Sequence, residues 1–305
     1  MRSVGALLVN FGQWELTRRC VKSLLESRGV EVIPALVDNA TPGEVPGWVP
    51  ETPGLVFRRE SGNYGLTRST NTAFSLLEDR HVDYVLVLNN DTEVDPEAVR
   101  LLVDHLEGHP EAGIAAPAIL YADRPDLVWS AGGVLNPWIM KVRQDYRTPE
   151  ELPDHPVKAT STSGCAILMR TADYVAIGMQ DPSLFVYCED NDLCFRARNA
   201  GMEIHLVPDS RILHHVSVSV GGILSPMAVY FTHRNRYIVA SRYLPPLQRA
   251  VFALYYMSVT AAKTILYPVR GVPGLVRWMW LAAVHGLSGR AGIVPSGLLG
   301  DGERR

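Results

Sequence analysis

The chain has 305 residues, of which 47% are hydrophobic and 20% are charged, and its formal net charge is −3. This composition excludes a disordered chain, and the charge, without any basic stripe, gives no support for a nucleic-acid partner. The length allows one large domain or two modest ones. The four cysteines form no CxxC pair and are typical of reduced cytosolic thiols. The apolar start of the chain lacks the length of a signal peptide and is better interpreted as a strand.

Short apolar runs alternate with helical patterns in the first part of the chain. We expect strands at Val4–Asn10, Val32–Val37, Leu55–Arg58 and Tyr84–Leu88, and helices at Leu16–Leu25 and Leu66–Leu77. Strands that alternate with helices predict an α/β fold whose sheet is mostly parallel, with right-handed crossovers.

The stretch YVLVLNNDTEVD begins as a strand buried on both faces and ends in Asn89, Asn90 and Asp91. Ligands of an open α/β sheet bind outside the carboxyl ends of its strands. A carboxylate there is well placed to hold a divalent cation that carries phosphates. Taken alone, the tripeptide is better interpreted as an ordinary polar turn with a helix cap, so the rest of the chain must decide. Asp95 is expected to cap the next helix, with Pro96 as its first residue.

Polar residues also follow two earlier strands, at Asn10 and at Asp38-Asn39. Parallel strands end on one side of a sheet, so these groups should converge into a nucleotide crevice. Asp38 could accept hydrogen bonds from a base or ribose there, or form an Asx-turn. The Gly62–Gly65 loop could let backbone approach phosphates, or be a tight turn.

The second half of the chain alternates short extended pieces with Gly, Pro and Asp. We expect strands at Ile114–Leu120, Val128–Val134, Ala166–Met169, Glu203–Val207 and Arg211–Leu213. The long segment from Gly132 to Lys158 is either part of an acceptor site or lid, or a surface loop.

A second acidic cluster, Glu189-Asp190, follows an apolar run and precedes a helix expected at Leu193–Gly201. Helix capping accounts for part of this cluster. One of the two carboxylates, facing a cavity, could act as a general base. His214, after a strand, could complete a metal site as an imidazole ligand.

The chain resembles glycosyltransferase family 2, the inverting GT-A enzymes, and most closely the rhamnosyltransferase-type branch of that family. The resemblance runs from about Val4 to Leu244 and rests on motifs that occur in the family's order: LLVNFGQWELTRRCVKSL, VDNAT, GNYGLTRSTN, LVLNNDTEVDP, TSGCAILMR, FVYCEDNDLCFRARNAG, LHHVSVSVGG and YFTHRNRY. Each motif is weak alone, whereas the ordered set is specific.

The resemblance implies roles for these residues. Asp91 would bind Mg²⁺ or Mn²⁺ on the donor diphosphate, with His214 beside it. Asp190 would be the base that deprotonates the acceptor, and Glu189 would contact a sugar. Donor or nucleotide contacts are implied for Asn10, Asp38, Asn63, Asn71, Asn89, Asn90 and Arg234. Asn89 replaces the first Asp of the metal motif, a variant common in this branch. One departure from the family pattern, the segment Arg68–Asn71, leaves the donor sugar undetermined.

We expect a GT-A domain at 1–245, with a nucleotide-binding half at 1–111 and an acceptor half at 112–245, followed by a helical segment at 246–305. The apolar segments Val251–Tyr267 and Leu275–Leu287 carry basic residues, which suits helices that lie on a membrane surface over 246–290, near a lipid-linked acceptor. They could instead pack on the catalytic domain or in a homo-oligomer, and we prefer the membrane interpretation. The tail from Gly297 is expected to fray.

The function predicted is an inverting, metal-dependent glycosyltransferase at the inner face of the cell membrane. It would move rhamnose or another hexose from a nucleotide-diphosphate donor to a saccharide or lipid-linked acceptor, in polysaccharide or glycolipid synthesis. One alternative is an inactive sugar-nucleotide-binding homologue, which Asn89 favours. Another is a nucleotidyltransferase, although no glycine-rich basic loop follows the first strand.

Overall fold

The computed structural model describes residues 1–216, 224–292 and 294–298. Its strands are β1 (Arg2–Asn10), β2 (Val30–Asp38), β3 (Val56–Arg59), β4 (Tyr84–Leu88), β5 (Thr92–Val94), β6 (Ala112–Tyr121), β7 (Val128–Ser130), β8 (Val134–Asn136), β9 (Lys141–Arg143), β10 (Val157–Ala159), β11 (Ala166–Arg170) and β12 (Glu203–His214). Its helices are α1 (Trp14–Leu25), α2 (Trp48–Glu51), α3 (Leu66–Ser75), α4 (Ala98–Gly108), α5 (Thr171–Ala176), α6 (Glu189–Asn199), α7 (Pro226–Tyr243), α8 (Pro246–Val269) and α9 (Gly274–Leu287), with 3₁₀ turns η1 (Glu78–Arg80) and η2 (Pro149–Glu151).

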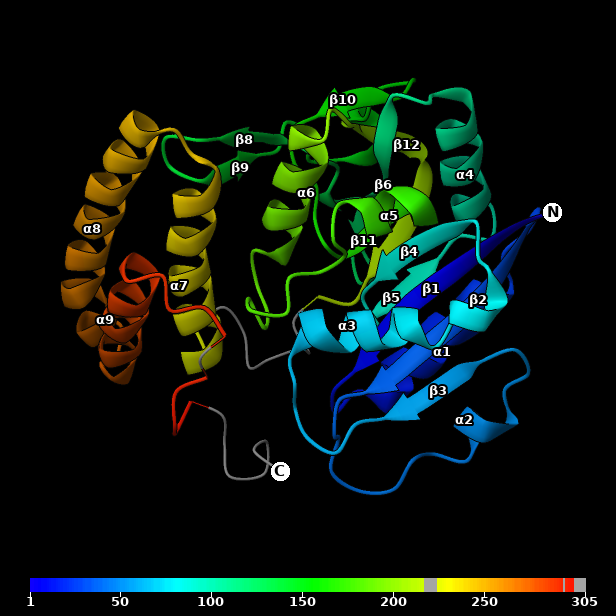
Figure 1. Ribbon diagram of the computed structural model, residues 1–305, viewed down its shortest axis with the longest axis horizontal. Coiled ribbons are helices and arrows are strands. Elements are labelled where there is room, and N and C mark those ends of the chain that lie inside the picture. The colour runs from blue at the N-terminus through cyan, green and yellow to red at the C-terminus, as the bar shows by residue number, and fades with distance from the viewer. Residues whose placement is uncertain (217–223, 293, 299–305) are drawn as a thin grey trace.

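One mixed sheet organises the described residues (Figure 1). Its order is β10-β12-β6-β11-β4-β1-β2-β3, with β5 beside β12 and β7 beside β6. The strands β1 to β4 are parallel, as the sequence predicted, and β6 is parallel to β12. Between these two parallel groups lies β11, which is antiparallel to both β4 and β6. The carboxyl ends of β1, β2 and β4 therefore meet at one edge.

Helices cover both faces of the sheet because the strands are apolar on both sides. Leu8 of β1 points toward the core formed with α1 and α4, whereas Leu7 points toward the core formed with α3, α5 and α6. This alternation follows from the two-residue period of a strand. All five residues of β4 are buried, as expected for a strand covered on both faces.

A second group of helices, α7 to α9, stands beside the sheet (Figure 1). It joins the rest of the protein through an apolar core in which Phe195 of α6 packs with Tyr237 of α7 and Phe252 of α8. Leu135 and Met140, from the hairpin of β8 and β9, belong to the same core. The region expected to be a long loop thus forms part of the junction between the sheet and the C-terminal helices.

Helix α7 was not predicted from the sequence. Its side chains are buried around most of its circumference, so its sequence lacks the apolar stripe of a surface helix. Ser225 caps it, since its Oγ accepts the N–H of Ala228 at 3.1 Å. The motif YFTHRNRY lies on this helix and not beside the sheet.

Two predicted boundaries were wrong. Asp95 does not cap α4, which begins at Ala98; its carboxylate accepts the N–H of Glu97 at 2.9 Å in a local turn. Helix α6 begins at Glu189, four residues before the predicted start, so the acidic pair lies in its first turn.

Other predicted elements were divided differently. The two strands predicted at Glu203–Val207 and Arg211–Leu213 form one strand, β12, with a register shift against β6 between them. The predicted strand Val128–Val134 is divided between β7 and β8. Leu298 is buried, contrary to the frayed tail expected there. The last seven residues of that tail, and 217–222 of the motif LHHVSVSVGG, lie outside the described residues.

Helix α8 is longer than the predicted apolar segment, with 24 residues. Among the described residues it is the one helix whose length and composition would suffice to cross a membrane, with a mean hydropathy of 1.2 and 22% of its most apolar window buried. Length and composition do not distinguish a spanning helix from one that lies on a surface.

Candidate functional site

The polar ends of β1, β2 and β4 form one hydrogen-bonded network. Asn10 and Asp38 are in register on paired strands, and Asn10 Nδ2 donates to Asp38 Oδ1 at 2.9 Å. Both side chains are fully buried, and Asp38 Oδ2 lies 3.2 Å from Arg59 Nε. Thr17 Oγ1 donates to Asn10 Oδ1 at 2.9 Å and accepts from Asn90 Nδ2 at 2.8 Å. The predicted convergence of polar strand ends is therefore present.

The glycine loop after β3 is tied to the same edge. Asn39 Nδ2 donates to Asn63 Oδ1 at 2.7 Å, and Asn39 Oδ1 accepts the N–H of Tyr64 at 2.9 Å. Gly65 has a φ of +83°, and a Cβ there would lie 2.5 Å from the ring of Phe185. Glycine is needed at this position for its backbone angle and for close contact with the 184–188 segment.

Asp91 and His214 form a buried pair after β4 and at the end of β12. His214 Nε2 lies 3.1 Å from Asp91 Oδ1, and the ring of Trp129 meets the imidazole edge-on at a centroid distance of 4.4 Å. His214 Nδ1 is buried without a hydrogen-bond partner among the described residues. A buried polar atom without a partner is costly, and a bound ligand can offset this cost.

Glu189 and Asp190 occupy the first turn of α6. Asp190 Oδ1 accepts both the backbone N–H and the side-chain Nδ2 of Asn191, at 2.7 and 2.8 Å. Asp190 Oδ2 accepts the N–H of Gly164 at 3.3 Å. Glu189 Oε2 is buried and has no hydrogen-bond partner among the described residues. The two neighbouring carboxyl groups therefore differ, since both oxygens of Asp190 accept hydrogen bonds and one oxygen of Glu189 does not.

The environment of this pair favours protonated carboxyl groups. Burial, and then the charges of Asp190 and Asp192, raise the pKa of Glu189 to about 8. Burial also raises the pKa of Asp190, against the opposing effect of its hydrogen bonds. A carboxylate whose pKa is raised toward neutrality accepts a proton more readily, which suits a general base.

The segment that leads into the acidic pair is conformationally strained. Phe185, Tyr187 and Cys188 have φ values of +68°, +67° and +64°. Residues other than glycine rarely adopt positive φ, which costs roughly 1–3 kcal/mol per residue. Such strain is concentrated at functional sites. The surrounding structure must therefore hold this segment in place.

Helix α7 supplies that support through Arg234 and Asn235. Asn235 Nδ2 lies 2.7–2.9 Å from the carbonyl oxygens of Leu184, Val186 and Tyr187. Arg234 Nη2 donates to the carbonyl of Leu184 at 2.9 Å, and Arg234 Nε donates to Asn235 Oδ1 at 2.8 Å. Arg234 is fully buried, which lowers its pKa. The pair positions the backbone before the acidic residues.

Two consecutive residues before β11 connect the strand-end network with the acidic pair. The carbonyl of Cys165 accepts the N–H of Asn89 at 2.8 Å, while Gly164 N–H binds Asp190. A Cβ at Gly164 would lie 3.2 Å from Asp190 Cβ. The structure thus brings the carboxyl ends of the strands and the start of α6 together around one short segment.

Residues 6–175 match the family model for glycosyl transferase family 2. The chain belongs to glycosyl transferase family 2. This match confirms the resemblance found in the sequence and identifies the protein as a glycosyltransferase.

Relatives in this family include two kinds of rhamnosyl transferase. An N-acetylglucosaminyl-diphospho-decaprenol L-rhamnosyltransferase of Mycobacterium tuberculosis is 29% identical over 244 residues, which cover 71% of this chain and 76% of the relative. A dTDP-rhamnosyl transferase, RfbF, of Shigella flexneri is 22% identical over 234 residues, covering 70% of this chain and 77% of the relative. The rhamnosyltransferase-like character predicted from the motifs is confirmed.

Solved structures share the fold. A crystal structure of GalNAc-T7 with UDP, GalNAc and Mn²⁺ superimposes with a TM-score of 0.66 at 16% identity, covering 92% of this chain and 55% of the other. S. aureus TarS 1–349 gives a TM-score of 0.52 at 14% identity, covering 83% and 70%. These likenesses confirm the predicted GT-A fold.

Two residues of this family 2 enzyme that were predicted to bind the donor, Asn71 and Arg234, form hydrogen bonds with the protein backbone. Asn71 exchanges two hydrogen bonds with the backbone of Gln180, at 2.8 and 3.1 Å. Arg234 is buried against backbone carbonyls, as described above. Their donor contacts, like those of the other predicted site residues, stay predictions. Thr17 and Trp129 were not singled out in the sequence, since nothing in their local pattern indicates a contact with distant strand ends.

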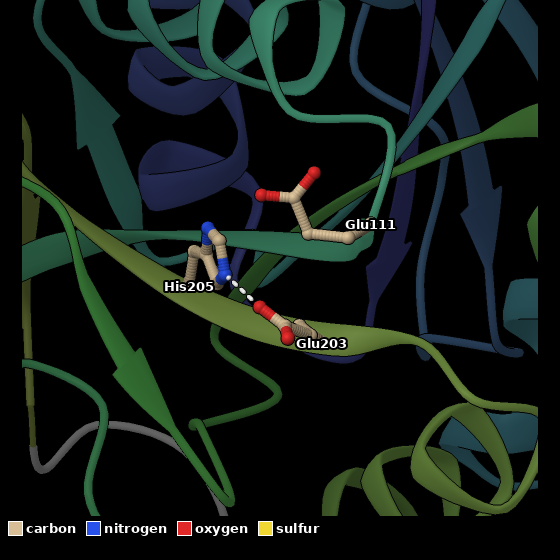
Figure 2. A group of neighbouring side chains, drawn as sticks. All are labelled: Glu111, Glu203 and His205. Atoms are coloured by element: carbon tan, nitrogen blue, oxygen red, sulfur yellow. Dashed lines mark hydrogen bonds and ion pairs between the residues drawn. The ribbon is translucent and has the colours of Figure 1, made fainter.

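A second histidine–carboxylate group lies at the opposite end of β12, which we call the far-end cluster (Glu111, Glu203, His205 and His105). Figure 2 shows His205 turned toward Glu203, with Glu111 on the chain that leads into β6. The potential metal-binding atoms of Glu111, Glu203 and His205 lie within 4.8 Å of one another. His205 Nε2 is 2.9 Å from Glu203 Oε2, and His205 Nδ1 is 2.8 Å from His105 Nε2.

Proposed function

We propose that this family 2 glycosyltransferase carries out metal-dependent, inverting transfer of a rhamnosyl or related hexosyl group. The donor would be a nucleotide-diphosphate sugar and the acceptor a saccharide or lipid-linked saccharide, used at the inner face of the cell membrane. The observation that carries this proposal is the junction at Gly164-Cys165, where the strand ends that would hold the donor meet the acidic pair that would activate the acceptor.

The residues present fit a divalent cation at Asp91 and His214. A carboxylate oxygen and an imidazole nitrogen are a donor set that Mn²⁺ accepts, and Mg²⁺ favours the carboxylate. The buried pair lies at the strand ends, and His214 Nδ1 has no partner among the described residues. When bound, the cation would neutralise charge on the leaving diphosphate. Asn89 would contribute a neutral amide beside it.

The chain's own residues would perform the other parts of the reaction. Asp190 would accept the proton of the attacking acceptor hydroxyl, while its hydrogen bonds to Asn191 and Gly164 orient the carboxylate. Glu189, with a pKa near 8, would be largely protonated at neutral pH and could donate a hydrogen bond to a sugar hydroxyl. A single displacement inverts the anomeric configuration and requires no carboxylate nucleophile.

The outer face of α8 supports contact with a membrane surface. Leu247, Val251, Leu254, Ile265 and Val269 recur at helical spacing and are exposed, Leu254 and Ile265 each by 72%. An apolar helix face of this kind, flanked by basic residues, suits burial at a lipid interface. The M. tuberculosis relative is named for an acceptor on diphospho-decaprenol, which supports a lipid-linked acceptor here. A homo-oligomer contact is the alternative for this face.

A binding screen would test the function. Thermal unfolding of the protein would be measured with UDP-, dTDP- and GDP-sugars, each with Mn²⁺, with Mg²⁺ and with a chelator. We expect one nucleotide class to stabilise the protein only with metal, because a ligand that binds the folded state alone raises its stability. The name of RfbF favours dTDP. A flat response to every donor would contradict the proposal and favour an inactive homologue.

A further inference from the structure

A cavity of about 310 Å³ lies beside the acidic pair, between the β8–β9 hairpin and α7. It is lined by Met140, Lys141 and Val142 of the hairpin, by Cys188 and Asn191 around the start of α6, and by Arg236 of α7. Its volume is at the lower end of the range of about 300–1,000 Å³ that is typical of small-molecule sites. Asn191 also holds the Asp190 carboxylate at 2.7 and 2.8 Å, so the cavity adjoins the proposed base.

Positive charges gather at this cavity. Arg236 and Lys141 line it. On α8, burial and then the charges of Arg236 and Lys141 lower the pKa of Lys263. Lys263 Nζ lies 3.3 Å from His233 Nε2, and the His233 pKa is lowered to about 3, chiefly by burial, so this neighbour is neutral. Two half-buried cations, Arg236 and Lys263, therefore lie near the exposed Lys141. The Arg236 guanidinium lies 5.9 Å from the Tyr256 ring centroid, and that ring lies 5.0 Å from the ring of His233, the neighbour of Lys263.

None of these three cations has a carboxylate within 4.0 Å among the described residues. Two other arginines differ, since the half-buried Arg196 pairs with Asp192 at 2.8 Å and the exposed Arg242 pairs with Asp181. Like charges held together in a partly desolvated place are unfavourable unless an anion joins them. An oxyanion of the substrate would provide that charge.

We propose that Lys141, Arg236 and Lys263 form a subsite for a phosphate or diphosphate group of the acceptor. This inference rests on the proposed function, which supplies the acceptor's place beside Asp190. The donor diphosphate belongs at the strand ends with Asp91, so an anion in this cavity belongs to the acceptor. The position next to Asp190 would hold the phosphorylated end of the acceptor while its hydroxyl reaches the base.

The test uses inorganic pyrophosphate, titrated into the full-length protein in the presence of a chelator. The side chain of Lys141 is exposed. We expect Lys141→Gln and Lys263→Gln each to weaken pyrophosphate binding about tenfold, which is the loss expected for one charge-assisted hydrogen bond. Lys22→Gln on α1, an exposed lysine outside the cavity, is the matched control and should bind as the parent does. Thermal unfolding of each variant checks that it folds.

A second titration with farnesyl diphosphate identifies the source of the anion. Binding at least tenfold tighter than that of pyrophosphate, with the same loss in Lys141→Gln, indicates a lipid-linked diphosphate. Equal affinities for farnesyl diphosphate and pyrophosphate indicate that the acceptor is a water-soluble phosphorylated saccharide.

Equal pyrophosphate affinity in the parent, Lys141→Gln and Lys263→Gln, or no binding at all, would overturn the subsite. Metal-dependent donor stabilisation measured on the same samples separates the two ideas. If the donor binds and the lysine variants change nothing, only the subsite fails. If no donor binds the parent protein, the proposed function itself fails.

Discussion

Each end of β12 carries a histidine beside a carboxylate, but only one of the two histidines has partners for both ring nitrogens among the described residues. At the amino end, His205 contacts Glu203 through one nitrogen and His105 through the other, and Lys158 Nζ occupies the second oxygen of Glu203 at 2.7 Å. At the carboxyl end, His214 contacts Asp91 through one nitrogen, and its other nitrogen is buried without a partner among the described residues.

The difference shows which group is built for a ligand. Protein groups occupy both nitrogens of His205 and both oxygens of Glu203 in the far-end cluster, so the desolvation cost of these two groups is already offset. At the candidate site, Glu189 Oε2 and His214 Nδ1 remain without partners, and the adjoining 185–188 segment is strained. None of the far-end histidines or glutamates has a positive φ. Buried polar atoms without hydrogen-bond partners are expected at a site where a bound ligand supplies the missing hydrogen bonds.

The largest expected effect is on catalysis. Asp190→Asn keeps the size of the side chain and one acceptor oxygen for the two donors of Asn191, but loses the acceptor of the Gly164 N–H and the basicity. Transfer should therefore fall about 10²–10⁴-fold with donor binding retained. Glu203→Gln in the far-end cluster is the matched control and should stay within about twofold of the parent. Steady-state rates and donor thermal shifts measure both. Unchanged turnover in Asp190→Asn would exclude it as the base.

The next effect concerns metal-dependent donor binding. Asp91→Ala removes the anionic ligand, so the stabilisation that a donor at 100 times its Kd gives with Mn²⁺, about 2.7 kcal/mol, should be lost. His205→Asn, which removes an imidazole from the other end of the strand, should keep it. Thermal unfolding with donor, in Mn²⁺ and in chelator, is the measurement. A similar metal-dependent shift in Asp91→Ala would contradict the site.

A smaller effect is expected from the support of the strained segment. Asn235→Ala leaves three carbonyls of that segment without their amide donor, and the free energy of unfolding should fall by about 1–3 kcal/mol. Transfer should fall as well, because the acidic pair follows this segment. Ser241→Ala, on an exposed position of the same helix, is the control. Urea unfolding that fails to distinguish the two variants would argue against this role.

Stability should also depend on pH, with opposite signs in the two regions. The folded-state pKa of Glu189, about 8, exceeds the ordinary 4.5, so the folded protein binds the extra proton and stability falls as pH rises between these values. Glu189→Gln should therefore raise Tm above pH 8 and leave it unchanged near pH 4.

His105 should behave in the opposite way. Burial and two neighbouring histidines lower its pKa from 6.5 to about 4, so the unfolded state binds more protons and stability falls as pH drops through this interval. His105→Asn should reduce that loss. Tm measured from pH 4 to 9 tests both variants, and differences from the parent that do not vary with pH would refute this interpretation.

Much of the donor half could be predicted from sequence because its signals are local. The apolar runs of β1, β2 and β4 end in polar residues, and parallel pairing brings such ends together. The acceptor half was predicted less well. Helix α7 is buried on most sides and lacks an amphipathic pattern, and the start of α6 is preceded by residues with positive φ that no local rule indicates.

The sequence by itself determined the alternation of strands and helices, the family, and the carboxylates and amides at the strand ends. Only the tertiary structure decided that Arg234 and Asn235 support the 183–187 backbone, and that Lys141 and Arg236 line one cavity with Lys263 nearby. The physical reason is distance along the chain. Periodicity and turn chemistry act between near neighbours, whereas burial, ion pairing and unpaired polar atoms depend on residues that meet only when the sheet and the C-terminal helices pack together.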